Sequence, residues 1–275
     1  MIKFLLNFPL LGKVLLIPPR IIGSGSYIFN LIANYIVWIF RSNETTNFTY
    51  DLKEINLLYL SDFVATVTGR TTNEIDGYIK EIMTDADLFN HLVKVYAESD
   101  QKYKIDRLPK YSKRIGWYAI VRAVKPAIVI ETGIDKGLGS CVIASALLKN
   151  KSEGSDGFYY GTDINPKAGA FFSGQYAVAG KILIGDSIDS LKNLQIKNID
   201  VFINDSDHSE EYEAKEYETI KSKLNENSII IGDNSHSNSR LRQFALSTGR
   251  KFLFFQEMPN KHWYPGGGIG AAYKN

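Results

Sequence analysis

The sequence predicts an α/β protein, with a doubly wound, mostly parallel seven-stranded sheet, an antiparallel edge strand and a helical N-terminal extension. Three observations predict this class. Apolar runs that end in glycine or an acid alternate with helical patterns from about residue 127 onward. The last two apolar runs lie close together in the sequence, as in a hairpin at a sheet edge. Residues 1–108 show helical periodicity alone.

Helical patterns cover the N-terminal part at 28–40, 51–67, 71–83 and 85–99. The third of these, 71–83, opens with Thr71 and Glu74 at the spacing of a capping box. A charged, proline-containing stretch, 101–114, then reads as a connection to a second unit. The predicted domains are therefore a helical region, 1–108, and a sheet domain, 109–275.

The apolar segment 28–40 is thirteen residues long, which is short for a bilayer span. Asn30, Asn34 and Arg41 fall near one helical stripe and leave the rest of the circumference apolar. Such a helix is buried in a core, packed on a partner subunit or laid on a membrane surface. We favour packing in the interior or on another subunit, and we expect a homo-oligomer. The alternative for this helix is a peripheral membrane contact.

In the sheet domain the predicted strands are 127–133, 157–163, 181–186, 199–205, 228–234, 251–257 and 267–273. Helices are predicted between them, at 139–150, 166–178, 187–194, 209–224 and 239–249. In such open sheets, ligands bind beyond the carboxyl ends of the parallel strands. An acid lies at or near each of those ends, at Glu131, Asp163, Asp186, Asp205 and Asp233. We therefore expect one acid-lined crevice.

Charge and cysteine content argue against one class of function and indicate a cellular compartment. The 275 residues carry a formal net charge of +2 with no block of one sign, which argues against a dedicated nucleic-acid binder. The one cysteine, Cys141, lies in an apolar helical pattern and suits a reducing compartment. We expect a cytoplasmic protein that acts at the membrane surface if the N-terminal helices touch lipid.

The glycine loop "ETGIDKGLGS" (131–140) has the spacing G-x-x-x-G-x-G, which differs from the dinucleotide fingerprint G-x-G-x-x-G. It resembles the first motif of class I S-adenosylmethionine (SAM) methyltransferases, E/D-x-G-x-x-x-G-x-G. The resemblance covers about residues 110–275 and implies a Rossmann-like fold. It also implies cofactor contacts from one set of residues: Glu131, Gly133, Gly137, Gly139, Ser140, Asp163, Asp186, Ser187 and Asp205. The alternative is a set of turn glycines and helix-capping aspartates.

Asp205, Asp233 and Asn234 are hard oxygen donors on neighbouring strand ends, and such donors suit Mg²⁺ or another divalent cation. The "GDN" of 232–234 resembles the metal motif of catechol- and caffeoyl-CoA-type O-methyltransferases. Those enzymes carry a lysine base where this chain has His208, whereas macrolide-sugar O-methyltransferases are similar to it in having histidine there. The alternative is that these acids are caps and turn formers.

These resemblances imply a SAM-dependent, metal-assisted O-methyltransferase with His208 as the base. The expected acceptor is a hydroxyl of a sugar, a glycan or a glycosylated small molecule. Three alternatives stay open: a metal-independent methyltransferase on the same fold, a non-catalytic SAM-binding subunit, and a nicotinamide oxidoreductase, against which the glycine spacing argues. Trp263 and Tyr264, in the loop 257–270, are expected either to cover the acceptor pocket as a lid or to pack in a hairpin loop.

Overall fold

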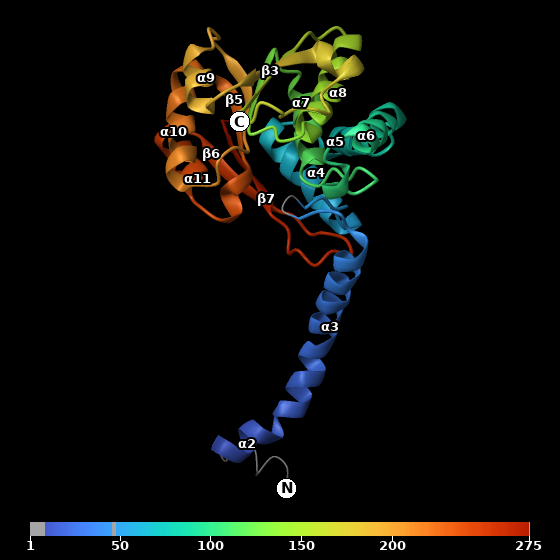
Figure 1. Cartoon of the computed structure of the whole chain (residues 1–275). Coiled ribbons are helices and arrows are strands. Elements are labelled where there is room, and N and C mark those ends of the chain that lie inside the picture. The colour runs from blue at the N-terminus through green and yellow to red at the C-terminus, as the bar shows by residue number, and fades with distance from the viewer. Residues whose placement is uncertain (1–8, 46–47, 275) are drawn as a thin grey trace. The chain divides into compact units, whose positions relative to one another are not determined.

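The computed structural model describes residues 9–45 and 48–274 and is drawn in Figure 1. The chain divides into two compact units. We call Met1–Asn43 with Lys261–Tyr264 the N-terminal unit, and Glu44–Asn260 with Pro265–Asn275 the sheet unit.

The sheet unit is built on seven strands in the order β3-β2-β1-β4-β5-β7-β6. Strands β1 to β5 run parallel, and β7 pairs antiparallel with both β5 and β6. This confirms the predicted doubly wound sheet and its antiparallel edge. The strands are β1 (Ile128–Thr132), β2 (Phe158–Asp163), β3 (Gly180–Ile184), β4 (Ile199–Asn204), β5 (Leu224–Gly232), β6 (Lys251–Gln256) and β7 (Gly268–Tyr273).

Helices cover both faces of the sheet (Figure 1). One face carries α9 (Ser187–Asn193), α10 (Glu210–Ile220) and α11 (Arg240–Ser247). The core on this side joins Phe202 and Ile230 of the sheet to Tyr217 and Phe244 of the helices. The other face carries α4 (Glu54–Thr68), α5 (Thr72–Met83), α6 (Ala86–Glu98), α7 (Arg114–Val124) and α8 (Leu138–Ser152). Apolar runs buried on both faces explain why the strands show no polar alternation.

The first compact boundary falls after Asn43, well before the predicted boundary at residue 108. The reason is packing, because α4 contacts α7 and β6, α5 contacts α7, and α6 contacts α8. Thr71 caps α5 by accepting from the Glu74 amide, as its capping-box spacing predicts. The stretch 101–114, read as a connection, contains only a short 3₁₀ turn (Lys102–Lys104) before α7 begins.

The helix predicted at 166–178 is wrong, since that segment forms turns and one 3₁₀ helix (Gly174–Ala179). Its backbone bonds to the glycine loop instead, where Gly169 N donates to the Asp135 carbonyl and Phe171 N to the Lys136 carbonyl. Gly169 has a φ of 75°, which an α-helix does not allow. Amides that donate to another loop are not free for a helical ladder.

The N-terminal unit contains α2 (Pro9–Leu15) and α3 (Ile17–Arg41). Helix α3 has 25 residues, almost twice the predicted thirteen, because it continues through the Gly-Ser-Gly-Ser stretch 23–26. Near its end the Trp38 ring packs on Trp263, with ring centroids 5.2 Å apart, and Tyr35 packs on Trp263 at 5.7 Å. Trp263 therefore belongs to an aromatic cluster with α3, which neither expectation for the loop 257–270 foresaw.

Candidate active site

The glycine loop joins β1 to α8 and passes directly over the end of β4. Gly133 has a φ of 78°, and a Cβ atom there would overlap the Asp205 carbonyl oxygen. Gly137 has a φ of 97° and caps the start of α8. Gly139 follows it in the first turn of that helix. The loop therefore brings backbone amides and a helix N-terminus to the carboxyl edge of the sheet, where a ligand can approach them.

Asp163, at the end of β2, is tied to this loop. Its Oδ2 atom accepts a hydrogen bond from the Asp135 amide at 2.9 Å, and its Oδ1 atom accepts one from the Asn165 amide at 2.8 Å. The carboxylate is half-buried. These bonds fix the side chain at the strand end, beside the glycine loop.

Asp186 caps α9 after the third strand. Its carboxylate accepts from the Asp189 amide at 3.0 Å and from the Tyr212 hydroxyl at 2.7 Å. The bond from Tyr212 is the main cause that lowers the pKa of Asp186. Ser187 is buried, and its hydroxyl donates to Glu216. Both residues lie where the sequence predicted them, just after the third strand. Asp186 caps a helix there, which was the alternative to a contact with the cofactor.

Glu131 and Ser140 lie beneath the glycine loop. Both are buried, and the Tyr159 hydroxyl bonds to both side chains. Burial raises the pKa of Glu131 to about 7, although the hydroxyl of Tyr159 and the charge of Arg114 act in the opposite direction. These contacts give Glu131 and Ser140 a role in supporting the loop from inside.

Asp205 and Asp233 come together because of strand register. Asn204 at the end of β4 pairs with Gly232 at the end of β5, so each acid follows one member of the pair. Their carboxyl groups lie within hydrogen-bonding reach of each other. The sequence predicted this juxtaposition from the strand ends alone.

The sequence did not predict the two cations that face these acids. The Lys113 ammonium contacts the Asp233 carboxylate and lies 3.5 Å from Asp205 Oδ1. The Arg114 guanidinium lies 3.9 Å from Asp205 Oδ2. Both cations also lie over the ring of buried Trp117, at 5.5 Å and 5.4 Å from its centroid. One feature of the sequence could have indicated these cations. It is the Lys-Arg pair that ends the stretch 101–114, directly before an apolar helical pattern.

The neighbouring charges give Asp205 and Asp233 different pKa values. Burial raises the pKa of Asp205 well above its ordinary value, and the neighbouring charge of Asp233 raises it further. For Asp233, burial raises the pKa, but the contact with Lys113 outweighs this and holds the pKa low. Asp233 is therefore the ionised member of the pair. A buried pair of acids beside two cations is an arrangement typical of functional sites.

His208 lies just beyond the end of β4 with its ring exposed to solvent. Its Nδ1 atom bonds to the side-chain oxygen of buried Asn234. An amide oxygen only accepts, so the hydrogen of the neutral ring is on Nδ1 and Nε2 is left as the acceptor. Asn234 thus orients the His208 ring. His236 is exposed, and its Nδ1 atom bonds to the Asp233 carbonyl at 3.1 Å.

The predicted metal ligands form an oxygen donor set that fits a divalent cation in chemistry: two adjacent carboxyls and one amide oxygen. The space beside the carboxyls holds the Lys113 ammonium, and the Asn234 oxygen is bonded to His208. In residues 9–45 and 48–274, no group of three or more His, Cys, Asp or Glu side chains is placed to hold a metal ion. Metal binding at this set therefore requires Lys113 to move away.

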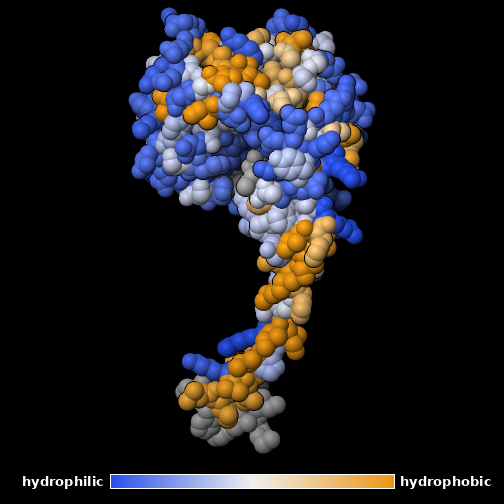
Figure 2. Space-filling model, viewed as in Figure 1, coloured by the Kyte–Doolittle hydropathy of each residue, from blue (hydrophilic) through white to orange (hydrophobic). Residues whose placement is uncertain are grey.

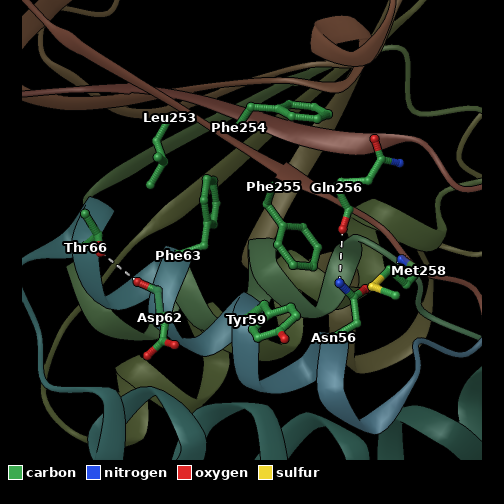
Figure 3. A pocket seen from close by; sticks show the side chains of 10 residues that line it. All are labelled: Asn56, Tyr59, Asp62, Phe63, Thr66, Leu253, Phe254, Phe255, Gln256 and Met258. Carbon is green, nitrogen blue, oxygen red and sulfur yellow. Dashed lines mark hydrogen bonds between the residues drawn. The ribbon is translucent and has the colours of Figure 1, made fainter.

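A hollow of about 410 Å³ lies elsewhere on the sheet unit, between α4 and the edge strand β6 (Figure 3). Phe63, Phe255 and Tyr59 line it, and the Asn56 amide donates to the Gln256 carbonyl at 3.0 Å. None of the predicted site residues lines this hollow.

Comparison with known proteins agrees with this geometry. Residues 130–235 match a family described as a methyltransferase domain. An O-methyltransferase from Bacillus cereus in complex with SAH has 16% sequence identity and a TM-score of 0.51, covering 77% of this chain and all of that one. A methyltransferase from Geobacter sulfurreducens has 17% identity and a TM-score of 0.51, covering 74% of this chain and 98% of that one. No curated protein matches the sequence. The sheet unit thus has the class I methyltransferase fold.

Proposed function

We propose that the protein transfers the methyl group of SAM to a hydroxyl group. The observation that carries this proposal is the glycine loop, which lies at one edge of a methyltransferase-type sheet together with Asp163 and the oriented His208. The loop offers backbone amides to the cofactor. Asp163 offers a carboxylate for the ribose, and His208 offers a base on the neighbouring strand end.

The proposed chemistry is a direct displacement. The Nε2 atom of His208 takes the proton from the acceptor hydroxyl, and the oxygen attacks the methyl carbon. The carbon–sulfur bond breaks, its electron pair stays on sulfur, and the sulfonium becomes a neutral thioether. The products are the methyl ether, S-adenosylhomocysteine and one proton. Since the donor is already activated, holding the oxygen in line with the methyl group supplies much of the acceleration.

For the acceptor we propose a hydroxyl of a sugar, a glycan or a glycosylated small molecule. A histidine base at this position is the feature shared with macrolide-sugar enzymes. The exposed ring of His208 leaves room for a bulky acceptor at the rim of the site. Lys113 and Arg114 add cationic donors to which the oxygens of a polyhydroxylated molecule can bond.

In its metal-assisted form, the proposal assigns Mg²⁺ to Asp205, Asp233 and Asn234. A divalent cation supplies a fixed positive charge that lowers the pKa of a bound hydroxyl. The chain's own part is then to hold the cation, to release Lys113 from Asp233, and to accept the proton at His208.

A second candidate, metal-independent transfer, is favoured by the position of Lys113. Its ammonium already neutralises the ionised Asp233 and lies against the carboxyls on which a cation would sit. In this form Lys113 supplies the fixed positive charge beside the acceptor oxygen. A lysine carries one charge instead of two, so it acidifies a hydroxyl less and leaves more of the work to His208.

One experiment separates these forms. The purified chain is treated with a chelator, given SAM labelled in its methyl group, and offered polyhydroxylated acceptors with and without Mg²⁺. Transfer that depends on Mg²⁺ supports the metal-assisted form, and equal transfer in both conditions supports the Lys113 form. Tight SAM binding without transfer to any acceptor would instead favour a non-catalytic SAM-binding subunit. Failure to bind SAM would overturn the proposed function.

A further inference from the structure

Helix α3 has the features of a segment that lies in a lipid bilayer. Arg20 and Arg41 enclose an uninterrupted run of uncharged residues, 21–40. At a rise of about 1.5 Å per residue, such a run spans roughly 30 Å, which is the thickness of the hydrocarbon core. Among the described residues, Leu10–Arg41 is the one stretch long and apolar enough to cross a membrane.

Most apolar side chains of α3 are not covered by other residues that the structure describes. All 25 residues of this helix are described, and none of them is buried. Ile22 is 78% exposed and Phe40 is 83% exposed. Figure 2 shows hydrophobic side chains along the length of this helix. An exposed apolar surface of this extent marks a contact with another molecule or with lipid.

The polar groups of the helix are compatible with hydrocarbon. Its backbone bonds are made within the helix, and the Ser24 hydroxyl donates to the Arg20 carbonyl at 2.8 Å. Asn30 and Asn34 are one turn apart, so their amides share one narrow stripe. This leaves the apolar residues on the remaining circumference for lipid tails.

The charges near the helix suit anionic lipid headgroups. Residues 1–43 contain four cationic residues, Lys3, Lys13, Arg20 and Arg41, and no Asp or Glu. These four charges exceed the formal net charge of the whole chain, +2, so the remainder is net acidic. Basic residues that flank an apolar helix bind the negative surface of a membrane.

Aromatic rings gather at the Arg41 end. Within the N-terminal unit, Tyr35, Trp38, His262 and Trp263 form one cluster, and Tyr264 packs edge-on against Trp263. Tryptophan and tyrosine favour the membrane–water boundary, where one part of the ring is apolar and the other polar. Trp38 lies 18 residues after Arg20 in the sequence. At about 1.5 Å per residue this is about 27 Å along the helix, which is near the opposite boundary.

We propose that a lipid bilayer is the partner of α3 and that residues 21–40 cross it, with Tyr35 and Trp38 at the boundary on the Arg41 side. The thirteen-residue pattern 28–40 predicts a helix too short to span a bilayer. Helix α3 has 25 residues, which is long enough. The rival occupant is a second copy of this chain, packed through the same apolar surface.

The test is flotation of the purified full chain with vesicles of phosphatidylcholine, with and without phosphatidylglycerol. We expect the protein to float with both, more with the anionic lipid, and to stay bound through high salt and alkaline carbonate. Leu31→Asp, at a side chain 52% exposed in the middle of α3, should lower the floated fraction at least fivefold. The matched control is Leu246→Asp on α11, 59% exposed, which should float like the wild type.

Equal SAM affinity of both variants shows that the sheet unit is folded. The proposal is overturned if wild-type protein does not float, if high salt releases it, or if Leu31→Asp floats equally well. A wild type that stays at the bottom as a dimer, and becomes monomeric with Leu31→Asp, overturns it in favour of the second copy.

Discussion

The ammonium group of Lys113 contacts the carboxylate of Asp233, and the two residues lie at the start of α7 and directly after β5. The contact gives the ionised acid of the site a cationic partner from within the chain. A divalent cation placed at this site would compete with Lys113 for the same carboxylate.

Replacing Lys113 should open the site to metal. Lys113→Met removes the competing charge, so we expect Mn²⁺ to bind at least tenfold more tightly than to the wild type, as measured by EPR. Lys110→Met, which removes an ion pair with Asp106, is the control and should change nothing. Adding Asp233→Asn to Lys113→Met should abolish the gain. Unchanged Mn²⁺ affinity in Lys113→Met would show that these acids do not form a metal site.

Removing the proposed base should affect chemistry and leave cofactor binding intact. His208→Ala deletes the side chain whose Nε2 atom is free to take a proton, and we expect kcat to fall by about 10²- to 10⁴-fold. SAM affinity, measured by calorimetry, should stay within about twofold, which distinguishes a catalytic effect from a folding defect. A variant with nearly wild-type kcat would rule out His208 as the base.

Asp163 should be needed for SAM affinity. Asp163→Ala removes the carboxylate that holds the Asp135 amide of the glycine loop, so we expect the Kd for SAM to rise at least tenfold. The control is Asp189→Ala on α9, whose side chain is exposed and pairs only loosely with Lys192. Equal SAM affinity of the two variants would contradict the assigned role of Asp163.

Gly133 should tolerate no side chain. Gly133→Ala combines a φ of 78° with a clash against the Asp205 carbonyl, and we expect it to cost about 3 kcal/mol of unfolding free energy or more. Gly154→Ala is the matched control, because it has a φ of 88° but open space around the added Cβ. It should cost only about 1–2 kcal/mol. Equal losses in urea unfolding would show that the close approach of Gly133 to the Asp205 carbonyl contributes nothing.

Glu131 should make stability depend on pH. Burial raises its pKa to about 7 from an ordinary value of 4.5, so the folded state keeps a proton that the unfolded state releases. The free energy of unfolding therefore falls as pH rises from about 4.5 to 7, by up to about 3 kcal/mol, and is then constant.

Glu131→Gln should remove that part of the slope, as measured by urea unfolding at about pH 5 and pH 8. The control is Glu153→Gln. Its bond from Arg122 lowers the pKa of Glu153 to about 2, so its effect on stability is lost only below about pH 4.5. If the free energy of unfolding of Glu131→Gln still falls between about pH 5 and pH 8, a group other than Glu131 causes the pH dependence.

The strands, their order along the chain and the glycine loop could be predicted from sequence because each depends on neighbouring residues. A buried parallel strand needs a short apolar run, and the tight turn after β1 needs glycine. The adjacency of Asp205 and Asp233 followed from a topological rule, since carboxyl ends of parallel strands share one edge. The helix predicted at 166–178 failed because its amides bond to a distant loop.

Contacts between residues far apart in sequence could not be predicted, because they depend on the tertiary structure. No local pattern places Lys113 on Asp233, because that contact depends on how α7 packs in the sheet unit, where Gly116 of this helix lies against the Ile269 side chain of β7. The bond from His208 to Asn234 likewise depends on the register of β4 against β5. The residue pattern was therefore enough to predict the fold class and the residues of the acid edge. The packing of helices on the sheet determined which charges meet there, because side-chain contacts depend on distances that sequence spacing does not specify.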